Sequence, residues 1–264
     1  MAATAHLSPE LRTVQRRAMW ALASREMRRV LSLWTQTLLP PVLTGVIFLA
    51  VFGGALGARL QAADIDYVRF ILPGLLVMTV VAQTFANNST SIFQAKSEGY
   101  IEDVLSSPMR PWQLLVGYMA GGLLRAWLSA LALWLLAWPF AGPVEYPAVT
   151  LAALALTGLM FAVLGVITGM WADTFDRHSF IANVLITPLA MVGGVFYVVD
   201  RLPQPWETLT YFDPIFYLVD ATRYGYTGLQ TASTWAALTV TAIVVAGVFA
   251  LAVALLHRGW RLKE

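Results

Sequence analysis

Residues 147–172 read PAVTLAALALTGLMFAVLGVITGMWA and contain no Asp, Glu, Lys or Arg. A helix of about 20 apolar residues crosses the ~30 Å hydrocarbon core of a bilayer. Five further stretches have similar length and apolar character, namely 35–57, 68–93, 113–139, 179–199 and 232–256. The sequence therefore predicts an all-α integral membrane protein with six transmembrane helices, in a membrane domain covering residues 35–256.

The composition agrees with this fold class. Of the 264 residues, 58% are hydrophobic and 12% are charged, whereas soluble domains are about half apolar and about a quarter charged. The chain has no cysteine, which excludes disulfide scaffolds, iron–sulfur clusters and thiol catalysis. Its net charge of +2 is too small to indicate a nucleic-acid partner.

Residues 1–34 form a distinct, arginine-rich segment before the first span. Apolar residues recur between the arginines at intervals of three and four, which predicts an amphipathic helix in the membrane interface. This helix either anchors the chain to membrane lipids or contributes to a partner-binding surface. The first apolar run begins near Thr35, too late for a cleavable signal peptide, so we expect a cytoplasmic N-terminus.

The distribution of basic residues gives an orientation. Six spans place both termini on one side, together with the loops that follow spans 2 and 4. Twelve of the 17 lysines and arginines then lie on that side, and four lie on the other. By the positive-inside rule, both termini and the tail, residues 257–264, are expected in the cytoplasm.

Several kinds of chemistry lack their usual residues. The predicted spans contain no Asp or Glu, which argues against a carrier driven by protons or sodium. The three histidines do not cluster, so no metal site is predicted. The only lysines, Lys96 and Lys263, do not follow a glycine and cannot belong to a G-x-x-x-x-G-K-[ST] phosphate loop. We therefore predict no catalytic residue and no ATPase motif in this chain.

The loop after the second span contains a short helical pattern. Ile101, Val104 and Leu105 share one face, Ser97 is a suitable N-cap, and Pro108 ends the helix. Such a helix either binds a protein partner through its apolar face or simply caps the bundle. The residues alone leave both readings open.

This loop resembles a known family. Glu98-Gly-Tyr-Ile-Glu-Asp-Val-Leu-Ser-Ser-Pro108 is similar to the E-G-x-x-E-x-L-x-x-x-P pattern of type-2 ABC exporter permeases, with Val104 where Leu is common. A second similarity runs from Thr187-Pro-Leu-Ala-Met-Val-Gly-Gly through Leu202-Pro and Asp213-Pro to Asp220-Ala-Thr-Arg-Tyr224. The N-terminal element with Trp34, Leu38 and the pair Pro40-Pro41 also fits the family. The resemblance covers nearly the whole chain.

The resemblance implies a role for each of these segments. The loop helix would be a coupling helix that seats in a separate ATPase subunit, through Glu98, Gly99, Ile101, Glu102, Val104, Leu105 and Pro108. Two such ATPase subunits, carrying ATP and Mg²⁺, would work with two permease copies, expected as a homodimer in a bacterial inner membrane. No cofactor is expected in this chain itself.

The segment Asp200–Thr231 is rich in Pro, Trp and Tyr, and its apolar pieces, such as Ile215–Val219, are too short to span a membrane. The residues alone fit either a re-entrant hairpin shielded from lipid or an ordinary external loop. The resemblance favours a re-entrant outer segment between spans 5 and 6. Its outer gate would include Pro203, Asp213, Pro214 and Arg223.

Polar residues inside two predicted spans suggest a transport pathway. Gln83, Asn87 and Asn88 lie in the second span and Arg125 lies in the third. Arg125 either contacts an anionic headgroup or sugar phosphate, or ties helices together through Gln83 or a backbone carbonyl. Lipid, saccharide and drug remain open as substrates, and an ion-gradient carrier or a non-transporting membrane scaffold remains the alternative function.

Overall fold

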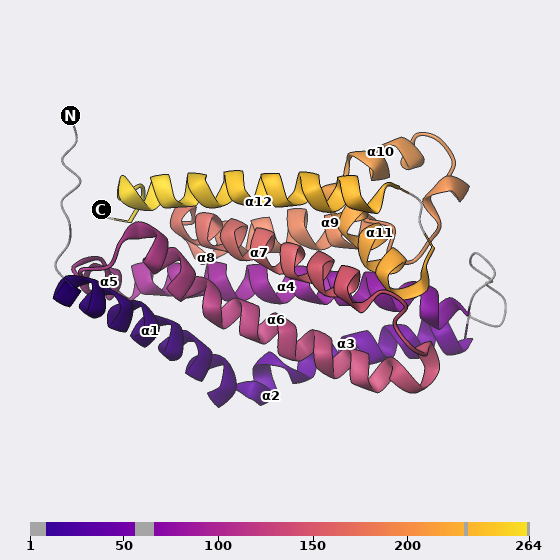
Figure 1. Cartoon of the computed structure of the whole chain (residues 1–264), viewed down its shortest axis with the longest axis horizontal. Helices are drawn as coiled ribbons and strands as arrows, with labels where there is room; N and C mark the ends of the chain where they lie inside the picture. The colour runs from indigo at the N-terminus through magenta and orange to yellow at the C-terminus, as the bar shows by residue number, and fades with distance from the viewer. Residues whose placement is uncertain (1–8, 56–65, 230–231, 263–264) are drawn as a thin grey trace.

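The computed structural model describes residues 9–55, 66–229 and 232–262. These residues form a bundle of helices and contain no strand. In Figure 1 the long helices run side by side along the horizontal axis. One end of the bundle carries α5 (Ile101–Leu105) and the C-terminus, and the other carries α10 (Trp206–Phe212) and α11 (Pro214–Thr227). We call them the α5 end and the α10 end.

Five helical stretches among the described residues are long and apolar enough to cross a membrane. They are Trp34–Phe52, α4 (Tyr67–Ser97), α6 (Pro111–Ala141), α7 (Pro147–Trp171) and α12 (Thr234–His257). At 1.5 Å per residue, the 31 residues of α4 or α6 measure about 46 Å. Because the bilayer core is only ~30 Å thick, both helices extend well beyond it.

The first of these stretches is not one continuous α-helix. It consists of α2 (Trp34–Thr37), α3 (Leu39–Phe48) and the π-helical segment η1 (Leu49–Ala55). Pro40 and Pro41 lie at the start of α3, where a missing N–H group removes no helical hydrogen bond. The end of the predicted first span, residues 56–57, and most of the following loop lie outside the described residues.

The predicted span 179–199 differs most from the structure. Its residues belong to α8 (Phe175–Phe180), the π-helical η2 (Ile181–Ile186) and α9 (Thr187–Val192), and helical structure ends at Val192 instead of Val199. The cause is a pair of glycines, Gly193 and Gly194, of which Gly194 has a φ of +75°. Their missing side chains let this turn lie against Ile215 and Phe216 of α11.

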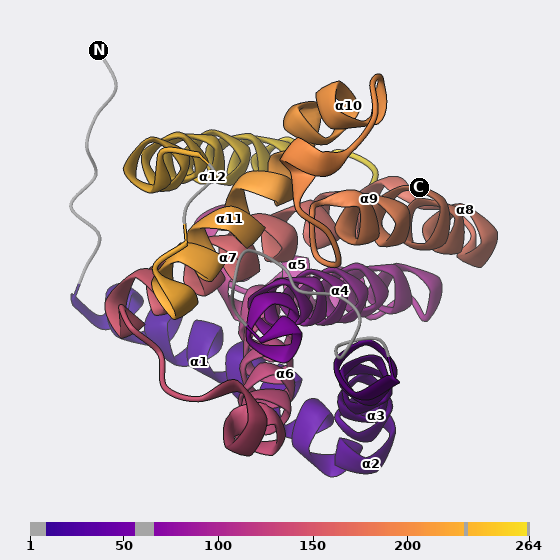
Figure 2. The same ribbon diagram turned by 90° about the vertical axis from the view of Figure 1, so that its right-hand side faces the viewer.

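The segment after this turn is folded rather than extended. It contains a short 3₁₀ turn (Val199–Arg201), α10 and α11. α11 is largely buried and packs against α7, α4 and α12. It therefore forms part of the bundle and covers the α10 end, as Figure 2 shows.

α4 lies at the centre of the bundle, between α6 and α7 (Figure 2). Glycines permit these close approaches. A Cβ atom on Gly169 of α7 would lie 2.6 Å from the carbonyl oxygen of Ser89, and one on Gly117 of α6 would lie 2.7 Å from Leu22 of α1. The glycine pairs Gly117 and Gly121 of α6 and Gly165 and Gly169 of α7 therefore pack helices within the subunit.

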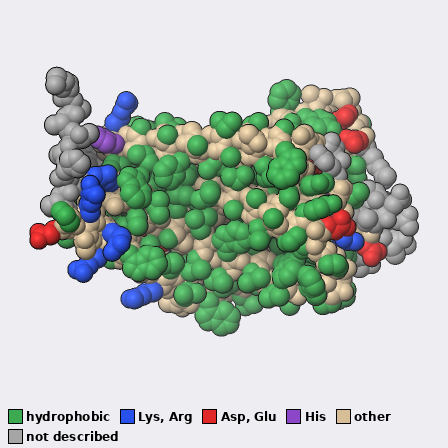
Figure 3. Space-filling model, viewed as in Figure 1, with side chains coloured by type: hydrophobic (Ala, Val, Ile, Leu, Met, Phe, Trp, Pro, Cys, Tyr) green, Lys and Arg blue, Asp and Glu red, His purple; other side chains and the backbone are tan. Residues whose placement is uncertain are grey.

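α1 (Pro9–Ser32) is the predicted N-terminal helix, and it crosses the bundle obliquely near the α5 end (Figure 1). Its buried face, with Leu22, Ala23, Glu26 and Val30, packs on α6. Figure 3 shows blue Lys and Arg side chains gathered near the α5 end, and a broad hydrophobic surface between the two ends. This distribution is that of a membrane protein with one strongly basic end.

Candidate functional site

The connection between α4 and α6 fixes the position of α5. Gly99 has a φ of +79° and turns the chain after α4, while Pro108 and Pro111 separate α5 from α6. The backbone N–H of Arg110 donates to Oε1 of Gln113 at 2.8 Å, which caps the first turn of α6. The loop is thus a defined structure at the polar end of the bundle.

The apolar face of α5 is turned toward its own chain. Ile101 is 3% exposed, and Val104 and Leu105 pack beside the same core cluster. The exposed residues of the predicted coupling motif are instead Glu98, Gly99, Glu102 and Pro108, with Asp103 beside them. A partner that meets α5 from outside therefore meets an acidic surface.

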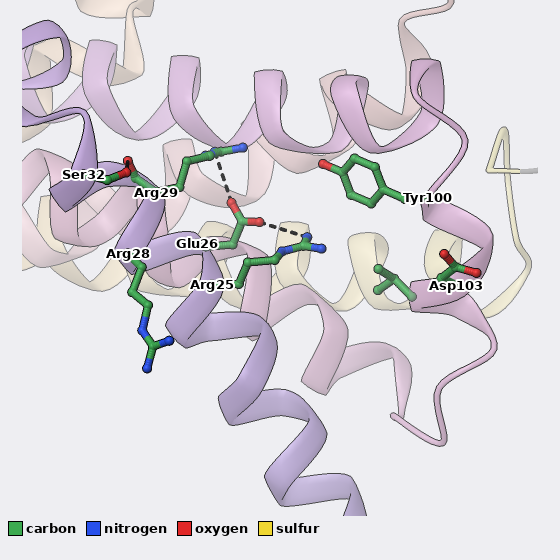
Figure 4. Close-up of a pocket in the computed structure, with 8 residues that line it drawn as sticks. Arg25, Glu26, Arg28, Arg29, Ser32, Tyr100 and Asp103 are labelled. Carbon is green, nitrogen blue, oxygen red and sulfur yellow. Dashed lines mark hydrogen bonds and ion pairs between the residues drawn. The ribbon is translucent and has the colours of Figure 1, made fainter.

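Three cavities surround α5. The first, of about 610 Å³, separates α5 from α1 and is lined by Arg25, Arg29 and Tyr100 among others (Figure 4). The second, of about 820 Å³, is lined by Lys96, Glu98, Glu102, Asp173 and Arg261 among others. The third, of about 220 Å³, lies between Val104 and Leu105 on one side and His257 on the other. α5 is therefore bounded by open space on several sides.

An acidic residue of α1 that the sequence analysis did not identify lies beside the first cavity. Glu26 is 1% exposed, and its carboxylate contacts Arg25 at 3.0 Å and Arg29 at 3.1 Å. The hydroxyl of Ser91 on α4 donates to Oε2 of Glu26 at 2.6 Å. Leu22, Glu26 and Val30 recur at intervals of four, and this spacing is the signal that places Glu26 on the buried face.

Two groups near this cavity have shifted pKa values. Burial raises the pKa of Tyr100, although the positive charge of Arg25 acts in the opposite direction. The pKa of Arg25 also lies above its usual value, because burial lowers it but the attraction and hydrogen bond of Glu26 more than offset that effect. Arg25, whose side chain is 46% exposed, is thus a cation between Glu26 and Tyr100.

A second charge cluster joins several elements at the α5 end. The carboxylate of Asp173 contacts Arg177 at 2.8 Å, Arg261 at 3.0 Å and Lys96 at 3.7 Å. Nζ of Lys96 also donates to the carbonyl oxygen of Met170 at 2.7 Å. These contacts hold the ends of α4 and α7 and the C-terminal turn together beside α5.

The structure places the predicted pathway residues of α4 inside the subunit. Gln83, Asn87 and Asn88 are buried, and Nδ2 of Asn88 donates to the carbonyl oxygen of Ala162 on α7 at 3.3 Å. Asn87 and Asn88 lie against Gly121 and Gly122 of α6. Their carboxamides thus occupy contacts between α4 and its two neighbours.

Arg125 is only partly buried, and its guanidinium interacts electrostatically with Arg29 of α1. Within the described residues, no hydrogen bond joins it to Gln83, although each carries a buried atom without a partner. The predicted tie between these two residues is therefore not seen. Arg125 and Arg29 carry like charges, so this electrostatic interaction is a repulsion.

Three of the predicted outer-gate residues belong to α11 or its N-cap. Asp213 caps this helix by accepting a hydrogen bond from the N–H of Ile215 at 2.9 Å, and Pro214 occupies its first turn. Arg223 is 4% exposed, donates to the carbonyl oxygen of Gly194 at 2.6 Å and stacks over Phe70 at 4.1 Å. Pro203 lies apart from them, exposed in the turn before α10.

Burial raises the pKa of Asp213 to about 6, although its hydrogen bond from Ile215 acts in the opposite direction. Arg223 joins α11 to α4 and to the turn after α9. These residues therefore fix the position of α11 across the α10 end of the bundle.

Long apolar helices, a hydrophobic belt and a basic end define a polytopic membrane protein of the α-helical class. Comparison with known proteins extends this result. A family model described as ABC-2 type transporter matches residues 17–227. This chain belongs to the ABC-2 type transporter family of membrane permeases.

The chain is similar to several named proteins. It is 31% identical to the inner membrane transport permease YadH of Escherichia coli (strain K12), over 94% of this chain and 96% of that protein. It is 26% identical to nodulation protein J of Rhizobium leguminosarum bv. viciae, over 81% and 83%. It is 24% identical to the probable multidrug ABC transporter permease YbhR of Escherichia coli (strain K12), over 71% of this chain and 53% of that protein.

Proposed function

We propose that this chain is the permease subunit of an ATP-binding cassette exporter and receives mechanical work from a separate ATPase subunit through α5. Family membership supports a permease. The observation that carries the coupling role is the structure of α5, a short helix with an acidic outer face at the basic end of the bundle. ATP and Mg²⁺ would bind to the partner, because neither lysine of this chain follows a glycine.

The proposal includes a topology. The helical segments α8, η2 and α9 supply the sixth span in addition to the five apolar helices, and both termini are cytoplasmic. The high density of arginines near the α5 end supports this orientation. α10 and α11 then form a re-entrant outer segment. The protein is multi-pass in a bacterial inner membrane, as the name of the related YadH permease suggests.

The working complex would contain two copies of this chain and two ATPase subunits, with the substrate pathway between the permease copies. Binding of ATP would draw the ATPase subunits together and displace α5. Gln83, Asn87, Asn88 and Arg125 would then connect the coupling region to the pathway through helix packing. The substrate would be a lipid, a saccharide or a drug, and the named relatives, a nodulation protein and a multidrug permease, do not narrow this choice.

A photo-crosslinking experiment tests the coupling role. A benzophenone amino acid replaces Glu102 on the exposed face of α5, and irradiation in native membranes is followed by mass spectrometry. We expect a crosslink to a polypeptide that carries a G-x-x-x-x-G-K-[ST] motif. The control position is Trp206, which is 59% exposed at the α10 end and should give no such crosslink. Crosslinking of the ATPase from Trp206 instead of Glu102 would refute both the orientation and the role of α5.

A further inference from the structure

A cleft of about 610 Å³ separates α1 from the α5 loop. In Figure 4 the guanidinium groups of Arg25 and Arg29 turn toward Glu26, whereas Arg28 points away from it. Tyr100 and Asp103 lie on the opposite side of the cleft. Whether α1 contacts α5 across this cleft therefore depends on the orientation of the Arg25 side chain.

Arg25 contacts both sides of this cleft. Its NH2 group donates to Oε1 of Glu26 at 3.0 Å, and its guanidinium carbon lies 5.1 Å from the centre of the Tyr100 ring. Tyr100 is the N-cap residue of α5 and immediately precedes the buried Ile101. A guanidinium over an aromatic ring is attracted by the ring's negative face. Arg25 thus joins the start of α5 to the carboxylate of Glu26.

Glu26 in turn contacts the centre of the bundle. Its Oε2 accepts the hydroxyl hydrogen of Ser91 on α4 at 2.6 Å and pairs with Arg29 at 3.1 Å. Its Cβ lies against Gly121 of α6, where an added Cβ atom would be only 3.0 Å away. One buried carboxylate therefore meets α4, α6 and, through Arg25, the start of α5.

We propose that Glu26 is a positioning residue that transmits displacement of α5 to α4 and α6. This inference rests on the proposed function, because α5 must first be moved by an ATPase. A buried carboxylate that loses its partners is strongly disfavoured, so Glu26 keeps Arg25 and Ser91 in place when α5 moves. In addition to the apolar packing of α5 on the bundle, the contacts Tyr100–Arg25–Glu26–Ser91 connect the start of α5 across the cleft to α1 and α4.

The first experiment measures this link in the permease alone. The chain has no cysteine, so spin labels at Trp20 on α1 and Ser106 after α5, both exposed, report one distance. We expect a narrow distance distribution in the otherwise unchanged protein and a broader one in Glu26→Gln and in Tyr100→Leu. Tyr100→Phe keeps the ring and should stay narrow. Glu10→Gln makes the same change at an exposed position of α1 and serves as the control.

The second experiment measures ATP hydrolysis by the complex with its ATPase. Loss of a charged buried contact is expected to lower kcat by about threefold to tenfold in Glu26→Gln and Tyr100→Leu, with KM for ATP unchanged. Tyr100→Phe and Glu10→Gln should keep the full rate. If Glu26 and Tyr100 had only a structural role, these substitutions would instead lower the yield of folded complex and leave the rate of ATP hydrolysis per complex unchanged.

The outcomes separate this inference from the proposed function. Unchanged distance distributions and unchanged kcat in both Glu26→Gln and Tyr100→Leu would overturn the inference. A defect in Tyr100→Phe as large as in Tyr100→Leu would also overturn it, because the ring contact would then be irrelevant.

If no ATPase associates with the unsubstituted chain, the proposed function fails, whereas the distance measurement still decides whether Glu26 links α1 to α5. If Glu26→Gln does not fold, Tyr100→Leu removes the contact from the other side without disturbing the buried acid.

Discussion

At the scale of single residues, the informative groups are charges that the fold has buried. Glu26 and Arg223 are almost inaccessible, and each joins helices that are distant in sequence. Asp213 is buried as the N-cap of α11. Since an unpaired buried charge is costly, each of these residues depends on particular neighbours in the folded chain.

Asp213 makes the stability of the α10 end depend on pH. Its folded pKa of about 6 exceeds the usual value of 3.8, so the folded chain binds this proton more tightly than the unfolded chain does. This tighter proton binding stabilises the folded chain by up to about 3 kcal/mol. The stabilisation is complete at a pH below the pKa of Asp213 in the unfolded chain, and it is lost as the pH rises through the pKa of Asp213 in the folded chain.

Thermal unfolding in detergent, followed as a function of pH, tests this prediction. Asp213→Asn keeps an acceptor for the N–H of Ile215 but cannot titrate, so its unfolding temperature should not fall across this pH interval as that of the unsubstituted chain does. Equal pH dependence in the two proteins would show that Asp213 is not the titrating group.

Sequence reasoning identified the motif around α5 but not Glu26. Glu98 and Glu102 belong to a local motif, which needs no knowledge of the fold. Glu26 is one of two acids, with Glu10, in a helix that carries six arginines. Its burial depends on Ser91, which lies 65 positions further along the chain. The distance between Arg125 and Gln83 could not be predicted either, because it depends on how α6 rotates against α4.

At the scale of helices, close approach through glycine governs the packing of α4 and α7. Gly169→Ala would place a methyl group 2.6 Å from the carbonyl oxygen of Ser89, a backbone atom that cannot rotate away. We expect a loss of about 1–3 kcal/mol, as for other overpacked positions. Thermal unfolding of the purified protein in detergent measures this effect as a lower transition temperature.

Gly247→Ala in α12 is the matched control, because an added Cβ there has no neighbour within 4 Å. Alanine is the better helix former, so this variant should be unchanged or more stable by up to about 1 kcal/mol. If both variants lost stability equally, the close contact between α4 and α7 would not be the cause.

Helix existence was easier to predict than helix boundaries. α4, α6, α7 and α12 correspond to predicted spans, since long apolar runs have few alternatives to membrane helices. The stretch 179–199 was predicted as one helix because hydropathy does not reveal π-helical turns or the end at Gly193 and Gly194. α11 was not predicted as a helix, since its burial arises from contacts with α4 and α7.

At the scale of the whole molecule, the bundle connects two different polar ends through an apolar body. α12 contributes little to the core, and Trp235 and Ile243 on it are each 67% exposed. Such faces need lipid or a second copy of the chain as neighbours. The all-α membrane fold and the family could thus be predicted from the sequence, whereas the substrate could not, because no local motif encodes it.

The central proposal is that this chain controls ATP hydrolysis in a partner subunit through α5. The direct measurement is the hydrolysis rate of the reconstituted complex with Glu102→Lys, compared with Asp176→Lys, another exposed acid at the same end but outside α5. We predict a fall of about tenfold for Glu102→Lys, since reversed charge disrupts a complementary contact, and a nearly normal rate for Asp176→Lys. Equal rates in both variants and in the unsubstituted complex would contradict the claim.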